Sequence, residues 1–467
     1  MCPVASAGEV LGCSRAMQTF MVARHQHQNA ERLTKIDLKL EFLTLMISRI
    51  GLCRYLKQTM FWSLIPSIFL LSTHAIPSWL SSRLDTFDLR VHDFETTGRG
   101  ILTLRDRAPG DVVIAVPECD AFTASSLIER FPDVLERAVE QSTEMKLSDE
   151  QVLAMGLLLL RTEGDRYVSS LPERQYSVLE MPDAMRNLLP MAYMKIILAY
   201  QDHVQRLHAS LNDVLESKVS LEDFHWAFAT IRSRCVGMDD EDDDRILTSG
   251  TGEKRVILPA FDLLNHKFGS QAVKEYSHED QEYVLKTNDA YTKGDQVFIS
   301  YDEKRDNLKM LMTYGFCIPG NPEAVAFFDV DDLLGACSLA RPAYFTETVL
   351  QQLHGLIKKL GKERDLYELD GDSHQPRESL QDGINMMLEI EKQFLSEPDM
   401  TFAEDVFNAL VYLRKEEIGE RLSLIDQIQT DEAGWMPMLG SIRALLRAEQ
   451  EYLSIPDEPK QDRSAEL

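Results

Sequence analysis

Two polar motifs, Asp262-Leu-Leu-Asn265-His266 and Tyr301-Asp-Glu-Lys-Arg-Asp-Asn307, decide the fold of this chain, and Tyr314-Gly315-Phe316 follows them closely. Each motif comes just after a run of strand-forming residues, Val256-Ile-Leu258 in the first case and Val297-Phe-Ile-Ser300 in the second. The motifs offer amide, carbonyl, imidazole and phenol groups, which can hold a small polar molecule by hydrogen bonds. These residues are therefore candidates for one shared site.

Strand patterns lie on both sides of a long helical stretch. Short β-like runs occupy residues 87–117, broken by the Pro109-Gly110 turn, and resume at 256–258, 283–285 and 297–301. Between them, residues 124–232 carry apolar side chains at intervals of three and four, as in Ile197, Tyr200, Val204 and Leu207. Three further helical stripes, at 349–360, 406–413 and 438–453, are interpreted as ordinary core faces. The sequence predicts a β core that a helical insertion interrupts, followed by a helical C-terminal part.

A third motif completes the pattern near the start of the β core. Thr97-Gly98-Arg99-Gly100-Ile101 resembles the G-x-G turn of SET domains, and Ser233-Arg234 resembles the pair that precedes their second half. A lone G-x-G is weak evidence, so the order of all the motifs carries the argument. In that order the chain resembles SET-domain protein methyltransferases of the Rubisco large-subunit lysine methyltransferase class, over residues 84–455.

The resemblance implies an α+β fold, in which a β-rich SET core is interrupted by a helical insertion and followed by an all-α C-terminal substrate-binding lobe. The expected boundaries are 1–83 for an N-terminal extension, 84–123 and 233–320 for the two parts of the SET core, 124–232 for the insertion, 325–455 for the lobe and 456–467 for a disordered tail.

The resemblance also assigns roles to single residues. It implies S-adenosyl-L-methionine (AdoMet) as the cofactor and Tyr301 as the catalytic residue. The residues expected to bind the cofactor are Thr97, Gly98, Arg99, Gly100, Arg234, Asn265, His266, Tyr314 and Phe316, and those expected to bind the substrate are Arg234, Asp262, Tyr301 and Tyr314. No metal site is expected, because the cysteine cluster of zinc-bound SET enzymes is missing after Phe316.

The chemistry of methyl transfer suits these residue types. A phenol with a pKa of about 10 stays neutral at working pH, so the Tyr301 oxygen can orient an incoming amine and offer partial negative charge. A lysine nucleophile has an ordinary pKa of about 10.4, and burial beside a sulfonium cation favours its neutral form. Three structural alternatives stay open: an ion pair of Arg234 with the acidic run at 238–245, a turn cap for Asp262, and core packing for Tyr301.

The charge and cysteine content limit the partners. A formal net charge of −27 repels phosphate backbones, so direct nucleic-acid binding is not expected. Six adjacent carboxylates within Met238-Asp-Asp-Glu-Asp-Asp-Asp-Arg245 predict an exposed loop. The seven cysteines are odd in number and form no C-x-x-C pair, which indicates neither a disulfide framework nor a zinc site and fits a reducing compartment.

The first eighty residues differ from the rest of the chain. Arg54 and Lys57 precede a short apolar run at 61–71, and Thr73-His-Ala75 follows it, a pattern typical of a signal segment. Pro66 breaks this run, which is too short to span a bilayer, so no stable membrane span is expected. We expect import into a plastid or another organelle, with the cytoplasm or nucleus as the alternative. One hypothesis makes Met60 the true start; an amphipathic or buried helix is the other interpretation of the run.

The resemblance implies an AdoMet-dependent protein-lysine N-methyltransferase, and we expect it to act, as a monomer, on a non-histone protein substrate. The alternatives are a protein-histidine methyltransferase of the same class and a catalytically inactive SET-like protein-interaction module. Val236, just beyond Arg234, has no polar group to orient an imidazole, which favours lysine. The chain departs from the class at Asp165-Arg-Tyr-Val-Ser-Ser170, where a Ser/Trp/Pro/Tyr pattern normally precedes Leu171-Pro172, so the contacts of the insertion are expected to differ.

Overall fold

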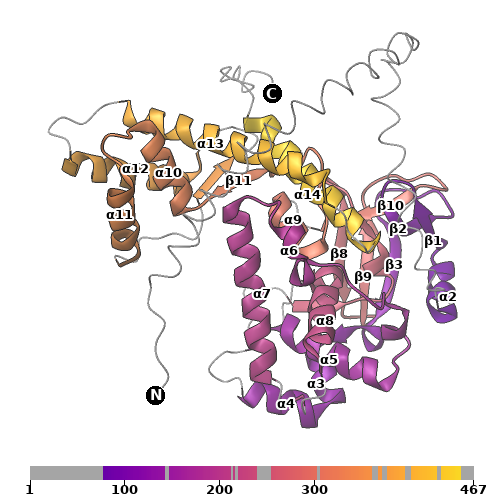
Figure 1. Ribbon diagram of the computed structural model, residues 1–467. Coiled ribbons are helices and arrows are strands. Elements are labelled where there is room, and N and C mark those ends of the chain that lie inside the picture. The colour runs from indigo at the N-terminus through magenta and orange to yellow at the C-terminus, as the bar shows by residue number, and fades with distance from the viewer. Residues whose placement is uncertain are drawn as a thin grey trace, which may run out of the picture. The chain divides into compact units, whose positions relative to one another are not determined.

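The computed structural model describes residues 77–141, 147–211, 214–215, 219–238, 254–301, 305–359, 367–370, 376–394, 401–428 and 433–453 (Figure 1). By its contacts the chain divides into Met1–Ser67 and Ile68–Leu467, and every described residue belongs to the second unit. The apolar run at 61–71, the Met60 hypothesis, the acidic residues 239–245 and the tail at 456–467 lie outside the described residues.

The β strands come from the segments before and after the helical insertion, and strands of one segment pair with strands of the other. β1 (Leu89–Phe94) and β2 (Gly98–Thr103) form a hairpin; β2 also pairs antiparallel with β10 (Gln296–Ile299), and β10 pairs in parallel with β7 (Asn265–His266). The second sheet has the order β3 (Asp111–Pro117), β9 (Glu282–Thr287), β8 (Ala272–Ser277), and the third has the order β4 (Phe122–Thr123), β6 (Lys254–Ile257), β5 (Val236–Met238). The predicted split of the β core is therefore confirmed.

Apolar side chains of these strands form one buried cluster. It contains Ile101 of β2, Val116 of β3, Leu285 of β9 and Val297 of β10. Helix α2 (Ser78–Thr86) adds Leu80 and Leu84 to the cluster, and the short 3₁₀ turn η4 (Phe261–Leu263) adds Phe261. Their burial supplies most of the driving force that holds the sheets together.

Helices fill the insertion as predicted. They are α3 (Ala124–Arg130), α4 (Pro132–Gln141), α5 (Asp149–Glu163), α6 (Asp183–Arg186), α7 (Met191–Leu211) and α8 (Leu221–Arg234), with 3₁₀ turns η1 (Glu118–Asp120), η2 (Val168–Ser170) and η3 (Val178–Glu180) around them. A capping box between Ser148 and Gln151 starts α5, and Gly164 ends it in the left-handed conformation at φ +73°. α5 packs against α8, and α8 ends at Arg234, beside the candidate site.

The C-terminal region is mostly helical. It contains α9 (Asn307–Tyr314), α10 (Val330–Ala340), α11 (Glu347–Lys359), α12 (Glu378–Phe394), α13 (Phe402–Ile425), the 3₁₀ turn η5 (Ala433–Trp435) and α14 (Met436–Leu453). The prediction of an all-α lobe left out one feature, because β11 (Val325–Phe328) pairs antiparallel with β12 (Tyr367–Asp370). All four residues of β11 are buried, so this strand lies within the core of the lobe.

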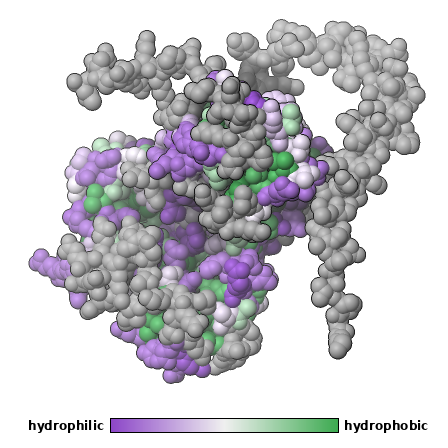
Figure 2. Space-filling model, turned by 90° about the vertical axis from the view of Figure 1, so that its left-hand side faces the viewer, coloured by the Kyte–Doolittle hydropathy of each residue, from purple (hydrophilic) through white to green (hydrophobic). Residues whose placement is uncertain are grey.

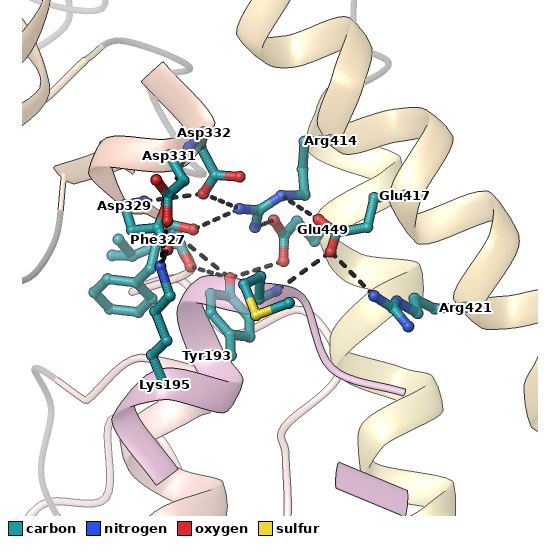
Figure 3. Close-up of polar contacts among 12 residues, drawn as sticks. Tyr193, Lys195, Phe327, Asp329, Asp331, Asp332, Arg414, Glu417, Arg421 and Glu449 are labelled. Carbon is teal, nitrogen blue, oxygen red and sulfur yellow. Dashed lines mark hydrogen bonds and ion pairs between the residues drawn. The ribbon is translucent and has the colours of Figure 1, made fainter. Parts of the chain in front are cut away.

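A buried charged network joins the insertion to the lobe (Figure 3). Arg414 of α13 donates from Nη1 to Glu449 Oε1 of α14 (2.9 Å) and from Nη2 to the Phe327 carbonyl of β11 (2.8 Å). Tyr193 of α7 donates its hydroxyl to Glu449 Oε2 (2.7 Å). The side chains of Arg414 and Glu449 are each 1% exposed. Burial raises the pKa of Glu449, and the Arg414 charge opposes that shift, so the carboxylate and the guanidinium depend on each other.

Among the coloured residues in Figure 2, hydrophilic surface alternates with separate hydrophobic areas. Large exposed apolar residues include Leu339 of α10 and Tyr412 of α13. Among the helices within the described residues, none combines the length and the apolar character that a membrane crossing requires.

We expect Arg414→Met to lower the free energy of unfolding by about 3–5 kcal/mol, because it leaves Glu449 as an uncompensated buried carboxylate. Chemical denaturation measures this change. The matched control is Arg443→Met, which removes an exposed ion pair with Asp426 and should cost less than about 1 kcal/mol. Equal effects of the two substitutions would contradict a central role for the buried network.

Candidate active site

The parallel pairing of β7 with β10 brings the two opening motifs together. Asn265 aligns with Phe298 and His266 with Ile299, which places Tyr301 just beyond the aligned residues. The Tyr301 main-chain N–H donates to His266 Nδ1 (3.0 Å), and the Tyr301 hydroxyl donates to the Leu264 carbonyl (2.8 Å). Tyr301 is therefore held at both ends by one segment, 264–266. An accepting Nδ1 also requires the His266 tautomer that carries its proton on Nε2.

The Tyr301 phenol lies among other aromatic rings. Its ring centroid is 4.6 Å from that of Tyr314 and 5.3 Å from that of His266, and Phe316 follows at 5.9 Å from Tyr314. Burial raises the pKa of Tyr301 well above its ordinary value, and the neighbouring Tyr314 adds to this effect. Because its proton is donated to Leu264, the lone pairs of the neutral hydroxyl oxygen are left to accept hydrogen bonds.

The Asn265 side chain holds the G-x-G turn. Its Nδ2 donates to the carbonyl of Arg99 (2.9 Å) and, at 3.4 Å, to that of Thr97, while the Thr97 hydroxyl donates to Gln296 Oε1 (2.8 Å). Gly98 has φ +68°, which favours glycine. The turn from Thr97 to Gly100 is therefore held against the Asn265 side chain.

Gly100 lies close to two protein amides, so a side chain at this position has no space. Its predicted contact with the cofactor stays a prediction. A Cβ at this position would lie 2.4 Å from Gln296 Nε2 and 2.6 Å from Asn265 Nδ2, so the space is taken by two protein amides. Gly100 therefore sets the position of Asn265 and Gln296.

Arg234 and Asp262 form the second part of the site. Arg234 Nη1 lies 2.9 Å from Asp262 Oδ2 and 3.3 Å from the Asp262 carbonyl oxygen. The Asp262 side chain is 2% exposed. The pair acts electrostatically on Tyr301, because the Arg234 charge lowers the pKa of the phenol and the Asp262 charge raises it. The partner that we considered for Arg234, the acidic run, lies outside the described residues from 239 onward.

Two residues near the site were missed from the sequence. Tyr167 donates its hydroxyl to Asp262 Oδ2 (2.9 Å). Gln296 contacts the G-x-G turn through Thr97. The only signal for Tyr167 was the departure from the class pattern at 165–170, and Gln296 had none, because a polar residue on a strand is usually solvated.

The donor groups suit a ligand with a carboxylate and polar heteroatoms. Two buried donors, Arg234 Nε and Gln296 Nε2, have no hydrogen-bond partner among the described residues. Such groups are costly to bury unless a ligand or water satisfies them. The described residues contain no group of three or more His, Cys, Asp or Glu side chains arranged to hold a metal ion.

We expect Gly100→Ala to displace the Asn265 and Gln296 amides and to lower the free energy of unfolding by about 1–3 kcal/mol, since its Cβ has no room. Thermal denaturation measures the effect. Gly440→Ala is the matched control, because a Cβ there meets nothing within 4 Å and alanine is the better helix former. A Gly100→Ala variant as stable as the wild type would show that the turn can accommodate the added methyl group.

Comparisons with known proteins identify relatives of the chain. No family model matches it. It is 25% identical over 285 residues to SET domain-containing protein 4 of Artemia parthenogenetica, covering 57% of this chain and 68% of the relative. The human protein of the same name is 23% identical over 406 residues, covering 78% and 88%. The chloroplastic Rubisco large subunit N-methyltransferase of Pisum sativum is 25% identical over 292 residues, covering 54% of each chain.

Solved structures agree on the fold. The SET domain of LSMT bound to lysine and AdoHcy matches with a TM-score of 0.50 at 17% identity, covering 81% of this chain and 92% of that one. The same domain bound to methyllysine and AdoHcy matches with a TM-score of 0.51 at 16% identity, covering 80% and 89%. Fold and sequence together confirm the resemblance to SET-domain methyltransferases of the Rubisco large-subunit class that the motifs indicated.

Proposed function

We propose that this chain is an AdoMet-dependent protein-lysine N-methyltransferase that acts on a non-histone protein. The observation that carries the proposal is the double attachment of Tyr301 to the 264–266 segment, which holds a neutral phenol oxygen against the Leu264 carbonyl and its ring near that of His266. The similarity to SET-domain relatives supports the same conclusion.

Several residues are suited to hold the cofactor. In the proposal, the main chain of Thr97 to Gly100 and the groups of Asn265 and His266 bind its adenosine and amino-acid parts, and Arg234 pairs with its carboxylate. Tyr314 and Phe316 supply apolar contact. When bound, AdoMet supplies a methyl group on a positively charged sulfur.

The protein contributes position and a dry environment. Tyr301 accepts a hydrogen bond from the substrate nitrogen and aligns it, and such alignment can supply several kcal/mol of the barrier. The aromatic rings of Tyr301, Tyr314 and Phe316 exclude water, which disfavours the lysine ammonium and releases the neutral amine. No strong general base is required, because burial disfavours the lysine ammonium and a bound sulfonium would lower the lysine pKa further.

The name of the Pisum sativum relative gives Rubisco, a non-histone protein, as the substrate of that relative, and calls it chloroplastic. We extend a non-histone protein substrate to this chain, and retain plastid import and a monomeric state as predictions. The net charge of −27 favours a basic surface on the substrate. In the proposal, the lobe at 325–455 binds the substrate protein. Asp262 and Arg234 lie where the substrate lysine enters the site.

The direct test is incubation of the full chain with methyl-labelled AdoMet and a cell lysate, followed by mass spectrometry of the labelled residue. Label on a lysine of a non-histone protein supports the proposal, whereas label on histidine supports the histidine alternative. Cofactor binding without any transfer would point to the inactive interaction module.

We expect Tyr301→Phe to reduce transfer by at least about 100-fold while AdoHcy affinity changes less than about threefold, because only the phenol oxygen is lost. The matched control is Tyr276→Phe, which removes a hydroxyl that donates to Glu118 away from the site. Transfer rates and calorimetry measure the two quantities. Full activity of Tyr301→Phe would exclude Tyr301 from the reaction.

The rate of transfer should rise with pH from about 7 to about 10, because the substrate lysine loses its proton while Tyr301, whose pKa is raised by burial, keeps its own. Initial rates at saturating AdoMet measure this profile, with circular dichroism as the check on folding. A falling limb below pH 9 in a folded enzyme would contradict a neutral, buried phenol.

A further inference from the structure

The helical insertion places one tyrosine directly behind the Arg234 and Asp262 pair. Tyr167 lies just before η2 and is 3% exposed. Its main-chain N–H donates to Asp165 Oδ1 (2.9 Å), and its ring centroid lies 5.3 Å from that of Phe122 on β4. The backbone and the ring are thus both fixed, and the hydroxyl points to a single acceptor.

That acceptor is the Asp262 carboxylate, which accepts hydrogen bonds from three groups. Asp262 Oδ2 accepts from the Tyr167 hydroxyl (2.9 Å) and from Arg234 Nη1 (2.9 Å), and Asp262 Oδ1 accepts from the Ala260 N–H (3.0 Å). Ala260 has φ +86°, an unfavourable conformation for alanine, so the Asp262 carboxylate also holds a strained turn. These contacts hold the Asp262 carboxylate in one position.

Arg234 depends on this carboxylate for its position. Arginine has a long side chain with much rotamer freedom, and among the hydrogen bonds of the described residues both of those made by the Arg234 guanidinium go to Asp262. Its Nε is buried and has no partner among the same residues. A cation held in this way can bind an anionic ligand group without paying much ordering entropy.

We propose that Tyr167 is a positioning residue of the cofactor site: its hydroxyl fixes the Asp262 carboxylate, which in turn aims Arg234 at the carboxylate of AdoMet. The proposal rests on the proposed function, because it takes Arg234 as a cofactor ligand. In this role Tyr167 acts through Asp262, to which its hydroxyl donates, and not by direct contact with the cofactor or the substrate.

A second triad of the same chemistry provides the control. In the buried network of the lobe, Tyr193 donates to Glu449, and Glu449 pairs with Arg414 (Figure 3). Tyr167 and Tyr193 are both buried, both come from the insertion, and both give a hydroxyl to a carboxylate that holds an arginine. They differ in location, because Arg234 lies in the candidate active site and Arg414 lies in the buried network of the lobe.

The test compares Tyr167→Phe with Tyr193→Phe in the full chain. We expect Tyr167→Phe to weaken AdoHcy binding about 5- to 20-fold, as measured by calorimetry, since it removes one hydrogen bond to a charged group. KM for AdoMet should rise by the same factor, while kcat at saturating cofactor changes less than about twofold. Tyr193→Phe should lower the thermal midpoint and leave the affinity unchanged.

A double-mutant cycle separates positioning from general destabilisation. In an Arg234→Ala background, adding Tyr167→Phe should cost no further affinity, because Tyr167 acts through Arg234. Unchanged affinity in Tyr167→Phe, an equal loss in Tyr193→Phe, or full additivity in the cycle would each overturn the proposal. Should Tyr167→Phe fail to fold, Asp262→Asn tests the same link, since it keeps an acceptor for Tyr167 but removes the charge that holds Arg234, and unchanged affinity there overturns it too.

AdoHcy binding by the wild-type protein distinguishes failure of the proposed function from failure of the positioning role. Wild-type protein that binds no AdoHcy would refute the proposed function and this inference with it. Wild-type binding with an unaffected Tyr167→Phe variant would refute the positioning role alone.

Discussion

The parallel pairing of β7 with β10 is the constraint on which the candidate site depends. It sets Asn265 opposite Phe298 and His266 opposite Ile299, so that Tyr301 reaches both the His266 ring and the Leu264 carbonyl. A shift of one residue in this register would turn the side chains of β10 to the opposite face and break the contacts of Tyr301 with His266 and Leu264. Parallel strands need a long connection, and here the β8 and β9 hairpin provides it. The two motifs are thus joined by topology before any side chain is considered.

Two tyrosines of the insertion each donate a hydrogen bond to a carboxylate that pairs with an arginine. Arg234 at the end of α8 and Arg414 in α13 each pair with a buried carboxylate, and each carboxylate accepts the hydroxyl of an insertion tyrosine. Burying a charge pair gains little stability by itself, but removing one partner is costly. Such triads therefore fix orientation more than they add stability. One orients a side chain at the site, and the other orients the lobe against α7.

The sequence was a good guide wherever the signal was local. The strands at 89–94, 111–117 and 282–287 could be predicted because apolar residues sit between turns, and the helices because their apolar spacing is regular. β11 and β12 could not, since each has four residues and is stabilised by pairing with a distant segment. The order of motifs located Tyr301, Asn265 and Arg234 as candidates. It could not place Tyr167, whose partner Asp262 lies 95 residues away, because no local pattern encodes a hydrogen bond over that separation.

The pairing of Arg234 with Asp262 also matters for the phenol. A guanidinium alone near Tyr301 would stabilise the phenolate and lower the pKa, whereas a carboxylate alone would raise it. Because Arg234 and Asp262 lie within hydrogen-bond distance of each other, their charges act on Tyr301 in opposite directions, and burial is the largest influence on the pKa of the phenol. A bound sulfonium cation would favour the phenolate further. The rise in pKa that burial causes opposes this effect. In the proposal, the Tyr301 oxygen therefore stays neutral, accepts a hydrogen bond from the amine and donates its own proton in a hydrogen bond to the Leu264 carbonyl.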